Sequence, residues 1–227
     1  MRLRQTAKSV WAVKSVWAWV RSAPGTYIWL LALLFTTLFL RRLPENVQEH
    51  FLGRRSTNLH YLAENPIRVL FSSAFWLEGG GWLGYLVLFT IFHATAERWL
   101  GTWRWLCVVV VAHVGATYLS EGVLYEGIRH GYVDQSAVNT LDVGVSYGLA
   151  GIVGVLVYLI AKPWRYVYLA GALIFYAVPL IFATNFTAVG HMSALLLGLA
   201  CYPITRARPA VWNPRDLLPS RRIPSVL

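Results

Sequence analysis

Charged residues are scarce in this sequence. They make up 13% of its 227 residues, whereas an ordinary soluble domain is roughly 25% charged. Hydrophobic residues make up 57%, and several apolar runs reach about 17 residues or more, the length that crosses ~30 Å of hydrocarbon. The shortage of charge argues against a soluble domain and indicates a polytopic membrane protein. One membrane domain would account for nearly the whole chain.

Acidic residues are the scarcest charged group, with 10 against 20 lysines and arginines and a net charge of +10. Such an excess is a possible sign of nucleic-acid binding. The basic residues, however, lie in the two tails and between apolar runs and not on one face, as membrane topology requires. We therefore expect the lipid bilayer as a partner and no nucleic acid.

Cysteine is also rare, and Cys107 and Cys201 both lie inside apolar runs. A disulfide framework is therefore not expected, and no metal-type spacing exists, so we expect no metal and no cofactor. The basic N-terminal region has no A-x-A-like cleavage site after the first apolar run, and we interpret it as a retained segment. Its basic residues and tryptophans suit an interfacial amphipathic helix or, equally, a flank that only fixes orientation.

The apolar runs predict six membrane-spanning helices in an all-α bundle. They cover residues 26–40, 82–96, 103–119, 141–160, 167–182 and 188–202. A long polar loop, 43–68, follows the first span, and an acidic loop, 120–142, follows the third. The predicted organisation is a membrane domain at 25–204 between a basic N-terminal segment (1–24) and a basic C-terminal tail (205–227).

A serine and a histidine within glycine-rich runs form the constellation that suggests chemistry. Ser146 lies near the start of the fourth span and His191 near the start of the sixth, so the topology gives them the same depth. Small residues at intervals of four allow membrane helices to pack closely. They are Gly144, Gly148, Gly151 and Gly154 in the fourth span and Gly190, Ala194 and Gly198 in the sixth. A neighbouring histidine can activate a serine hydroxyl; a packing role for the serine is the alternative.

In their order and spacing these motifs resemble the rhomboid family of intramembrane serine proteases. The Gly144-Val145-Ser146 segment resembles the family's G-x-S motif. His191, Ala194 and Gly198 resemble its final helix, in which the catalytic histidine precedes small residues. Further matches are the turn after the second span, with Glu97, Arg98 and Gly101, and the lead-in to that span, Ser72-Ser73-Ala74-Phe75.

The resemblance covers about residues 65–202 and implies a rhomboid-like bundle of six transmembrane helices. It also implies Ser146 as the nucleophile, His191 as the base and then the acid, and transmembrane proteins as substrates.

The chain departs from the family pattern around the expected oxyanion hole. Tyr147 stands where the family usually has glycine directly after the serine. The second span usually begins with a histidine and, a turn later, an asparagine; counting back from Glu97 gives Gly81 and Tyr85 there. Tyr85 is therefore one oxyanion candidate. Asn185, just before the last span, is another, with a turn role as its alternative.

Three functions are compatible with these residues. The first is a serine protease that cleaves transmembrane substrates through Ser146 and His191. The second is a catalytically inactive rhomboid-like protein that binds transmembrane clients. The third is a small transporter that uses His93 and His113. It is favoured least, because no span shows paired charges or repeated broken helices. The structural alternatives are a hydrogen-bonded pair of His93 with Glu97 at a helix end and a His113 bonded to a neighbouring helix.

Charge asymmetry gives a testable topology. Both tails and the turns between the second and third and the fourth and fifth spans are basic or mixed, whereas the loop 120–142 is acidic, so the positive-inside rule places both termini in the cytoplasm of a multi-pass plasma-membrane protein. Reporter fusions after Leu227 and within 120–142 should report opposite sides. The same side for both would break the six-span topology.

Overall fold

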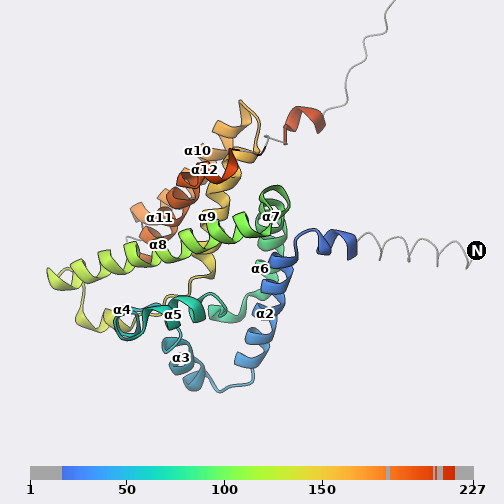
Figure 1. Cartoon of the computed structure of the whole chain (residues 1–227). Helices are drawn as coiled ribbons and strands as arrows, with labels where there is room; N and C mark the ends of the chain where they lie inside the picture. The colour runs from blue at the N-terminus through green and yellow to red at the C-terminus, as the bar shows by residue number, and fades with distance from the viewer. Residues whose placement is uncertain (1–16, 183–184, 207, 209–211, 218–227) are drawn as a thin grey trace, which may run out of the picture.

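The computed structural model describes residues 17–182, 185–206, 208 and 212–217, and these residues are mostly helical (Figure 1). Within these ranges no β-sheet forms, although an isolated parallel β-bridge joins Ile160 to Trp212. The predicted all-α class is confirmed. Residues 1–16 lie outside the described residues, and they include most of the predicted basic N-terminal segment and of the amphipathic helix considered for residues 1–23. Residues 207, 209–211 and 218–227 of the tail also lie outside.

The helices follow the predicted order. The long ones are α2 (Pro24–Leu40), α8 (Thr102–Arg129), α9 (Val145–Leu156), α10 (Trp164–Phe182) and α11 (Phe186–Ala200). The short ones are α3 (Glu45–Gly53), α4 (Leu59–Glu64), α5 (Pro66–Ser73), α6 (Trp82–Leu88), α7 (Ala94–Leu100) and α12 (Tyr202–Thr205). A π-helical turn, η2 (Phe89–His93), joins α6 to α7. The 3-10 turns are η1 (Glu78–Gly80), η3 (Gln135–Asn139), η4 (Val157–Leu159) and η5 (Pro214–Leu217).

Of these helices, α8 and α10 are each long and apolar enough to cross a membrane unaided. The other apolar helices, α2, α9 with η4, and α11, are shorter. Figure 1 shows α8 running across the molecule, with α9, α10 and α11 on one side and the short helices of the first loop on the other.

The third predicted span, 103–119, is too short, because α8 extends from Thr102 to Arg129. Residues 120–129, which we expected in an acidic loop, continue α8 to Arg129. Ser120, Glu121 and Leu124 are buried, so this part of α8 packs against the protein and is not a solvated connection. The helix ends at His130, and Gly131 follows with a φ of 73°, a conformation that favours glycine.

Close backbone contact between α9 and α11 forms the centre of the bundle. A Cβ added at Gly198 would overlap the carbonyl group of Gly151, and one added at Gly154 would overlap the carbonyl oxygen of Leu195. On its other side, Gly151 faces the Cβ of Ala112 on α8. Small residues therefore allow α8, α9 and α11 to approach one another more closely than larger side chains would allow.

Glu97 links the start of α2 to the turn between α7 and α8. Its carboxylate accepts hydrogen bonds from the backbone N–H groups of Gly25 (2.9 Å) and Thr26 (2.7 Å). It also accepts from the hydroxyl groups of Thr26 and Thr102, each at 2.8 Å. The N-cap residue of α2, Ala23, has no side-chain acceptor, so a carboxylate from another helix satisfies the unpaired donors there and complements the positive end of the helix dipole.

The two neighbours of Glu97 in the motif also have structural partners. Arg98 donates to the Ser22 hydroxyl (2.6 Å) and the Trp19 carbonyl (3.1 Å), and its guanidinium lies over the Trp19 ring. Gly101 has a φ of 86°, which lets the chain turn sharply between α7 and α8.

The expected pairing of His93 with Glu97 is wrong. Trp105 Nε1 donates to His93 Nδ1 at 3.1 Å, and the imidazole stacks on Phe89. Because the Glu97 oxygens receive the four donors from α2 and Thr102, the carboxylate is directed to the start of α2 and not to the preceding turn of its own helix.

Close packing at Gly151 gives a stability prediction. Gly151→Leu should lower the melting temperature in detergent, because overpacking commonly costs ~1–3 kcal/mol. Gly171→Leu on α10 is the matched control, since a Cβ added there meets nothing within 4 Å. Equal melting temperatures for the two variants would mean that the Gly151 face is not tightly packed.

Candidate active site

Ser146 is the second residue of α9, which begins after its N-cap, Gly144. The residue before the helix must be small, because the His113 imidazole of α8 occupies the space that a Cβ at Gly144 would need. His113 itself is bonded to a neighbouring helix: its Nε2 lies 2.8 Å from the Leu70 carbonyl oxygen and 3.3 Å from the Ser73 hydroxyl. This histidine therefore has the structural role that was one of its two expected roles.

His191 lies in the second turn of α11, in contact with two tyrosine rings. The Tyr147 ring meets the imidazole edge-on, with centroids 5.2 Å apart, and the Tyr176 ring of α10 stacks at 6.0 Å. Tyr147 is the residue after Ser146, so this contact brings the start of α9 to His191. Both Ser146 and His191 are half-buried.

No hydrogen bond joins Ser146 to His191 among the residues that the structure describes. Catalytic hydrogen bonds are often long before substrate binds, so the bonded dyad stays a prediction. Among the described residues, the Ser146 N–H group also has no hydrogen-bond acceptor, as is usual for the first N–H groups of a helix.

The two oxyanion candidates occupy different positions. Tyr85, on α6, is partly buried and packs edge-on against Phe89, with centroids 6.0 Å apart. Asn185 is the N-cap of α11, and its side-chain oxygen accepts from the Ala188 N–H at 2.7 Å. The turn role considered for Asn185 is therefore present, whereas the orientation of Tyr85 toward Ser146 stays a prediction.

Sequence reasoning missed a buried polar cluster beside Ser146. The Tyr147 hydroxyl donates to the Asp142 carboxylate (3.1 Å), which also accepts from the Thr57 hydroxyl (3.3 Å). The sequence predicts Asp142 at the end of an acidic loop, but the residue is only 3% exposed. The sequence signal that could have identified it is an aspartate four residues before Ser146, at the start of an apolar run.

Backbone bonds connect Asp142 to the segment between α3 and α4. Its N–H donates to the Ser56 hydroxyl (2.7 Å), and its carbonyl oxygen accepts from the Thr57 N–H (2.9 Å) and from the Ser56 hydroxyl (3.0 Å). Burial raises the pKa of the Asp142 carboxyl to about 6, although the hydrogen bonds from Tyr147 and Thr57 act in the opposite direction. The loop before Ser146 is thus fixed by polar contacts that keep a carboxyl group inside the protein.

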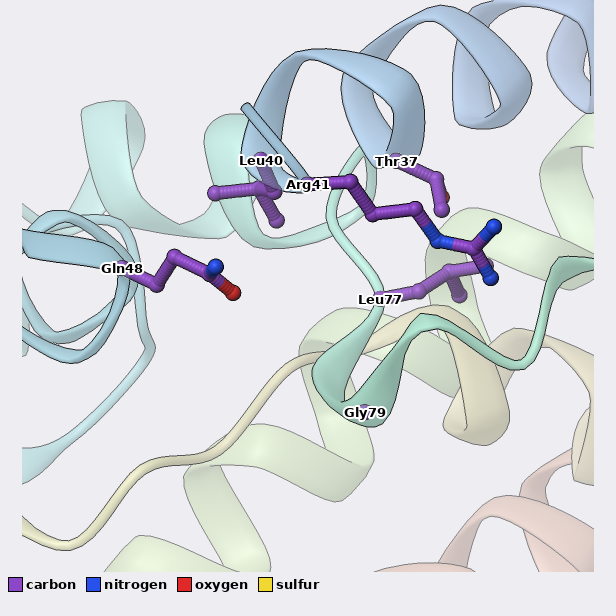
Figure 2. Close-up of a pocket in the computed structure, with 6 residues that line it drawn as sticks. All are labelled: Thr37, Leu40, Arg41, Gln48, Leu77 and Gly79. Atoms are coloured by element: carbon purple, nitrogen blue, oxygen red, sulfur yellow. The ribbon is translucent and has the colours of Figure 1, made fainter. Parts of the chain in front are cut away.

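A pocket of about 230 Å³ lies elsewhere, where α2 ends. Figure 2 shows its lining residues: Thr37, Leu40, Arg41, Gln48, Leu77 and Gly79. No residue named above as catalytic or oxyanion candidate lines it. Within the described residues, no group of three or more His, Cys, Asp or Glu side chains could hold a metal ion.

A family model described as "Rhomboid-like protein" matches residues 18–211. No curated protein and no solved structure gives a significant match.

The raised pKa of Asp142 predicts a pH-dependent stability difference. A folded-state pKa near 6, above the ordinary 3.8, means that wild-type stability falls as the pH rises through this window. Asparagine does not titrate, so the melting temperature of Asp142→Asn relative to wild type should increase from about pH 4 to about pH 7. Asp134→Asn is the control, because the pKa of this exposed carboxyl is lowered by its hydrogen bonds with Ser136. A difference for Asp142→Asn that does not change with pH would contradict the assignment.

Proposed function

Because this chain belongs to the rhomboid-like family, and is therefore a membrane protein, we propose that it is an intramembrane serine protease that cleaves transmembrane proteins. The observation that carries this proposal is the contact between the rings of Tyr147 and His191 at 5.2 Å. It brings the helix start that holds Ser146 to the histidine that the family motif identifies as the base. The supporting motif residues have structural roles: Glu97 and Arg98 bond to the start of α2 and to the residues before it, and Gly101 makes the sharp turn between α7 and α8.

In the proposed reaction, the Ser146 hydroxyl attacks the carbonyl carbon of a substrate peptide bond while His191 accepts its proton. The tetrahedral intermediate collapses, the carbon–nitrogen bond breaks, and the imidazolium returns the proton to the leaving amine. Water then hydrolyses the acyl-enzyme, with His191 acting again as base and then as acid. Ser146 is released with its proton, so the enzyme is regenerated.

The negative oxygen of the intermediate needs hydrogen-bond donors. The free N–H group of Ser146 at the start of α9 is a suitable donor, since a helix N-terminus also favours negative charge. Tyr85 and Asn185 are the side-chain candidates. Losing one donor of this kind commonly costs ~2.7–4 kcal/mol of transition-state stabilisation, so the departure from the family pattern would lower the rate unless these groups replace the usual ones.

Six spans with both termini in the cytoplasm would place Ser146 and His191 near the outer face of the plasma membrane. The proposed substrates are therefore transmembrane proteins cut close to that face. The bilayer surrounds the domain at 25–204, and the basic ends at 1–24 and 205–227 lie on the cytoplasmic side.

An inactive protein that binds transmembrane clients is the second candidate. It is favoured by the lack, within the described part of the chain, of a hydrogen bond between Ser146 and His191, and by Tyr147 in the place of the usual glycine. The transporter hypothesis is weaker, because His93 and His113 both make structural hydrogen bonds.

Labelling by a fluorophosphonate separates the two candidates. The wild-type protein in detergent should be labelled, and Ser146→Ala should abolish labelling, because the probe reacts with an activated serine. His191→Ala should reduce it strongly. Ser193→Ala is the control, since it removes another half-buried serine close to His191. A wild-type protein that is folded but not labelled would favour the client-binding candidate.

A further inference from the structure

Tyr147 fills the space between the starts of α9 and α11. Its side chain is fully buried. A Cβ added at Gly190 would overlap the Tyr147 ring, so the glycine directly before His191 is what makes room for it. The tyrosine that replaces the usual family glycine is therefore accommodated by a small residue on the opposite helix.

Both ends of the Tyr147 side chain have defined partners. The ring edge packs on the His191 imidazole at 5.2 Å and an interplanar angle of 73°, a favourable arrangement for an aromatic pair. The hydroxyl donates to the Asp142 carboxylate at 3.1 Å, with the Ser120 hydroxyl at 3.5 Å. Tyr176 also stacks on the imidazole, at an interplanar angle of 26°. The imidazole thus contacts two tyrosine rings, and the hydroxyl group of one of them, Tyr147, is hydrogen-bonded.

Asp142 is itself immobilised from the other direction. Ser56 and Thr57 bond its backbone and its carboxylate, so the acceptor of the Tyr147 hydroxyl cannot move independently of the first loop. The titratable groups that face Asp142 are the carboxyl groups of Glu121 on α8 and Glu78 in η1. Neither supplies a positive partner, so hydrogen bonds hold this carboxyl group in place.

We propose that Asp142 and Tyr147 are positioning residues for His191. The hydrogen bond from Tyr147 to Asp142 fixes the ring, and the ring holds the imidazole against Tyr176 in the orientation that a general base needs. The imidazole also has a hydrogen bond with the backbone of Thr187 in its own helix. Without a third catalytic side chain, the orientation of His191 depends on this bond together with the ring contact, because proton transfer requires defined geometry. This inference rests on the proposed function, since an inactive protein has no need of an oriented base.

The first test compares two tyrosine hydroxyls. Tyr147→Phe removes the bond to Asp142 and keeps the ring; Tyr168→Phe removes another bond between helices, from the Tyr168 hydroxyl to the Val153 carbonyl oxygen (3.0 Å). Tyr147→Phe should slow fluorophosphonate labelling and lower kcat for a transmembrane substrate by about tenfold, a fraction of the usual contribution of a positioned base, with KM within about twofold. Tyr168→Phe should lower the melting temperature and leave labelling unchanged. Equal labelling rates in Tyr147→Phe and wild type would overturn the proposal.

The second test measures coupling. Asp142→Asn keeps an acceptor for the Tyr147 hydroxyl and should label at a rate close to wild type at neutral pH, whereas Asp142→Leu should be as slow as Tyr147→Phe. The double variant Tyr147→Phe/Asp142→Leu should be labelled no more slowly than the slower of the two single variants, because both substitutions remove the same interaction. Multiplicative effects would contradict a shared role. Thr57→Val, which removes one donor to Asp142, is a milder variant that should change labelling in the same direction should the others fail to fold.

A third measurement does not depend on catalysis. NMR of protein with isotope-labelled histidine can follow the imidazole resonance of His191, which is assigned by its loss in His191→Gln. This resonance should shift in Tyr147→Leu and broaden in Tyr147→Phe. It should not change in Tyr168→Phe. Suppose that the resonance responds in this way but the fluorophosphonate does not label the wild-type protein. That result would contradict the proposed function and leave the ring contact established. Suppose instead that the fluorophosphonate labels the wild-type protein, but substitutions at Tyr147 change neither the resonance nor the labelling rate. That result would contradict the positioning role alone.

Discussion

The close backbone contact of α9 with α11 determines the arrangement of the rest of the bundle. At Gly151 and Gly198 the two helices approach without side chains between them. Four residues before Gly151 and seven before Gly198, the two helices lie at a distance that a single aromatic ring can bridge. Tyr147 is that ring, and it reaches from the residue after Ser146 to the imidazole of His191. Larger residues in the glycine positions would separate the helices and remove this contact, although neither glycine touches the candidate site.

A second constraint acts at the opposite end of the spans. The Glu97 carboxylate satisfies the start of α2, which has no N-cap of its own, and bonds Thr102 at the start of α8. One carboxylate therefore fixes the relative positions of three helices. Four donors and the positive end of the helix dipole surround the Glu97 carboxylate. The carboxyl group of Asp142 accepts from two hydroxyl groups, and its burial, with Glu78 nearby, raises its pKa.

The sequence predicted the order and class of the helices well, because long apolar runs and basic turns report directly on local structure. It also identified the glycines that line the contact between α9 and α11, since their spacing is local. It failed where tertiary contacts decide the outcome. Glu121 reads as a loop residue by its charge, yet it is buried on an extended α8. Glu97 shares a helical face with His93, yet donors from α2 and Thr102 take its oxygens.

The site shows the same division between local and long-range information. Ser146 and His191 could be named from motifs, and the placement of both near helix starts follows from the chain order. The role of Asp142 could not be predicted, because its partners at positions 56 and 57 are distant in the sequence and no local pattern links them. Tyr147 was recognised as a departure from the family, but its ring contact became visible only once the geometry of Gly190 and His191 was known.

The bonds between Asp142 and the segment at Ser56 and Thr57 have a consequence for biosynthesis. The two partners are up to 86 residues apart, so the ribosome completes the first loop long before the chain that satisfies it exists. The first loop lacks these partners until the fourth apolar segment has been made, and His191 follows in the sixth. A nascent chain therefore contains Ser146 before it contains His191, and α9 and α11 can pack against each other only after Gly198 has been made.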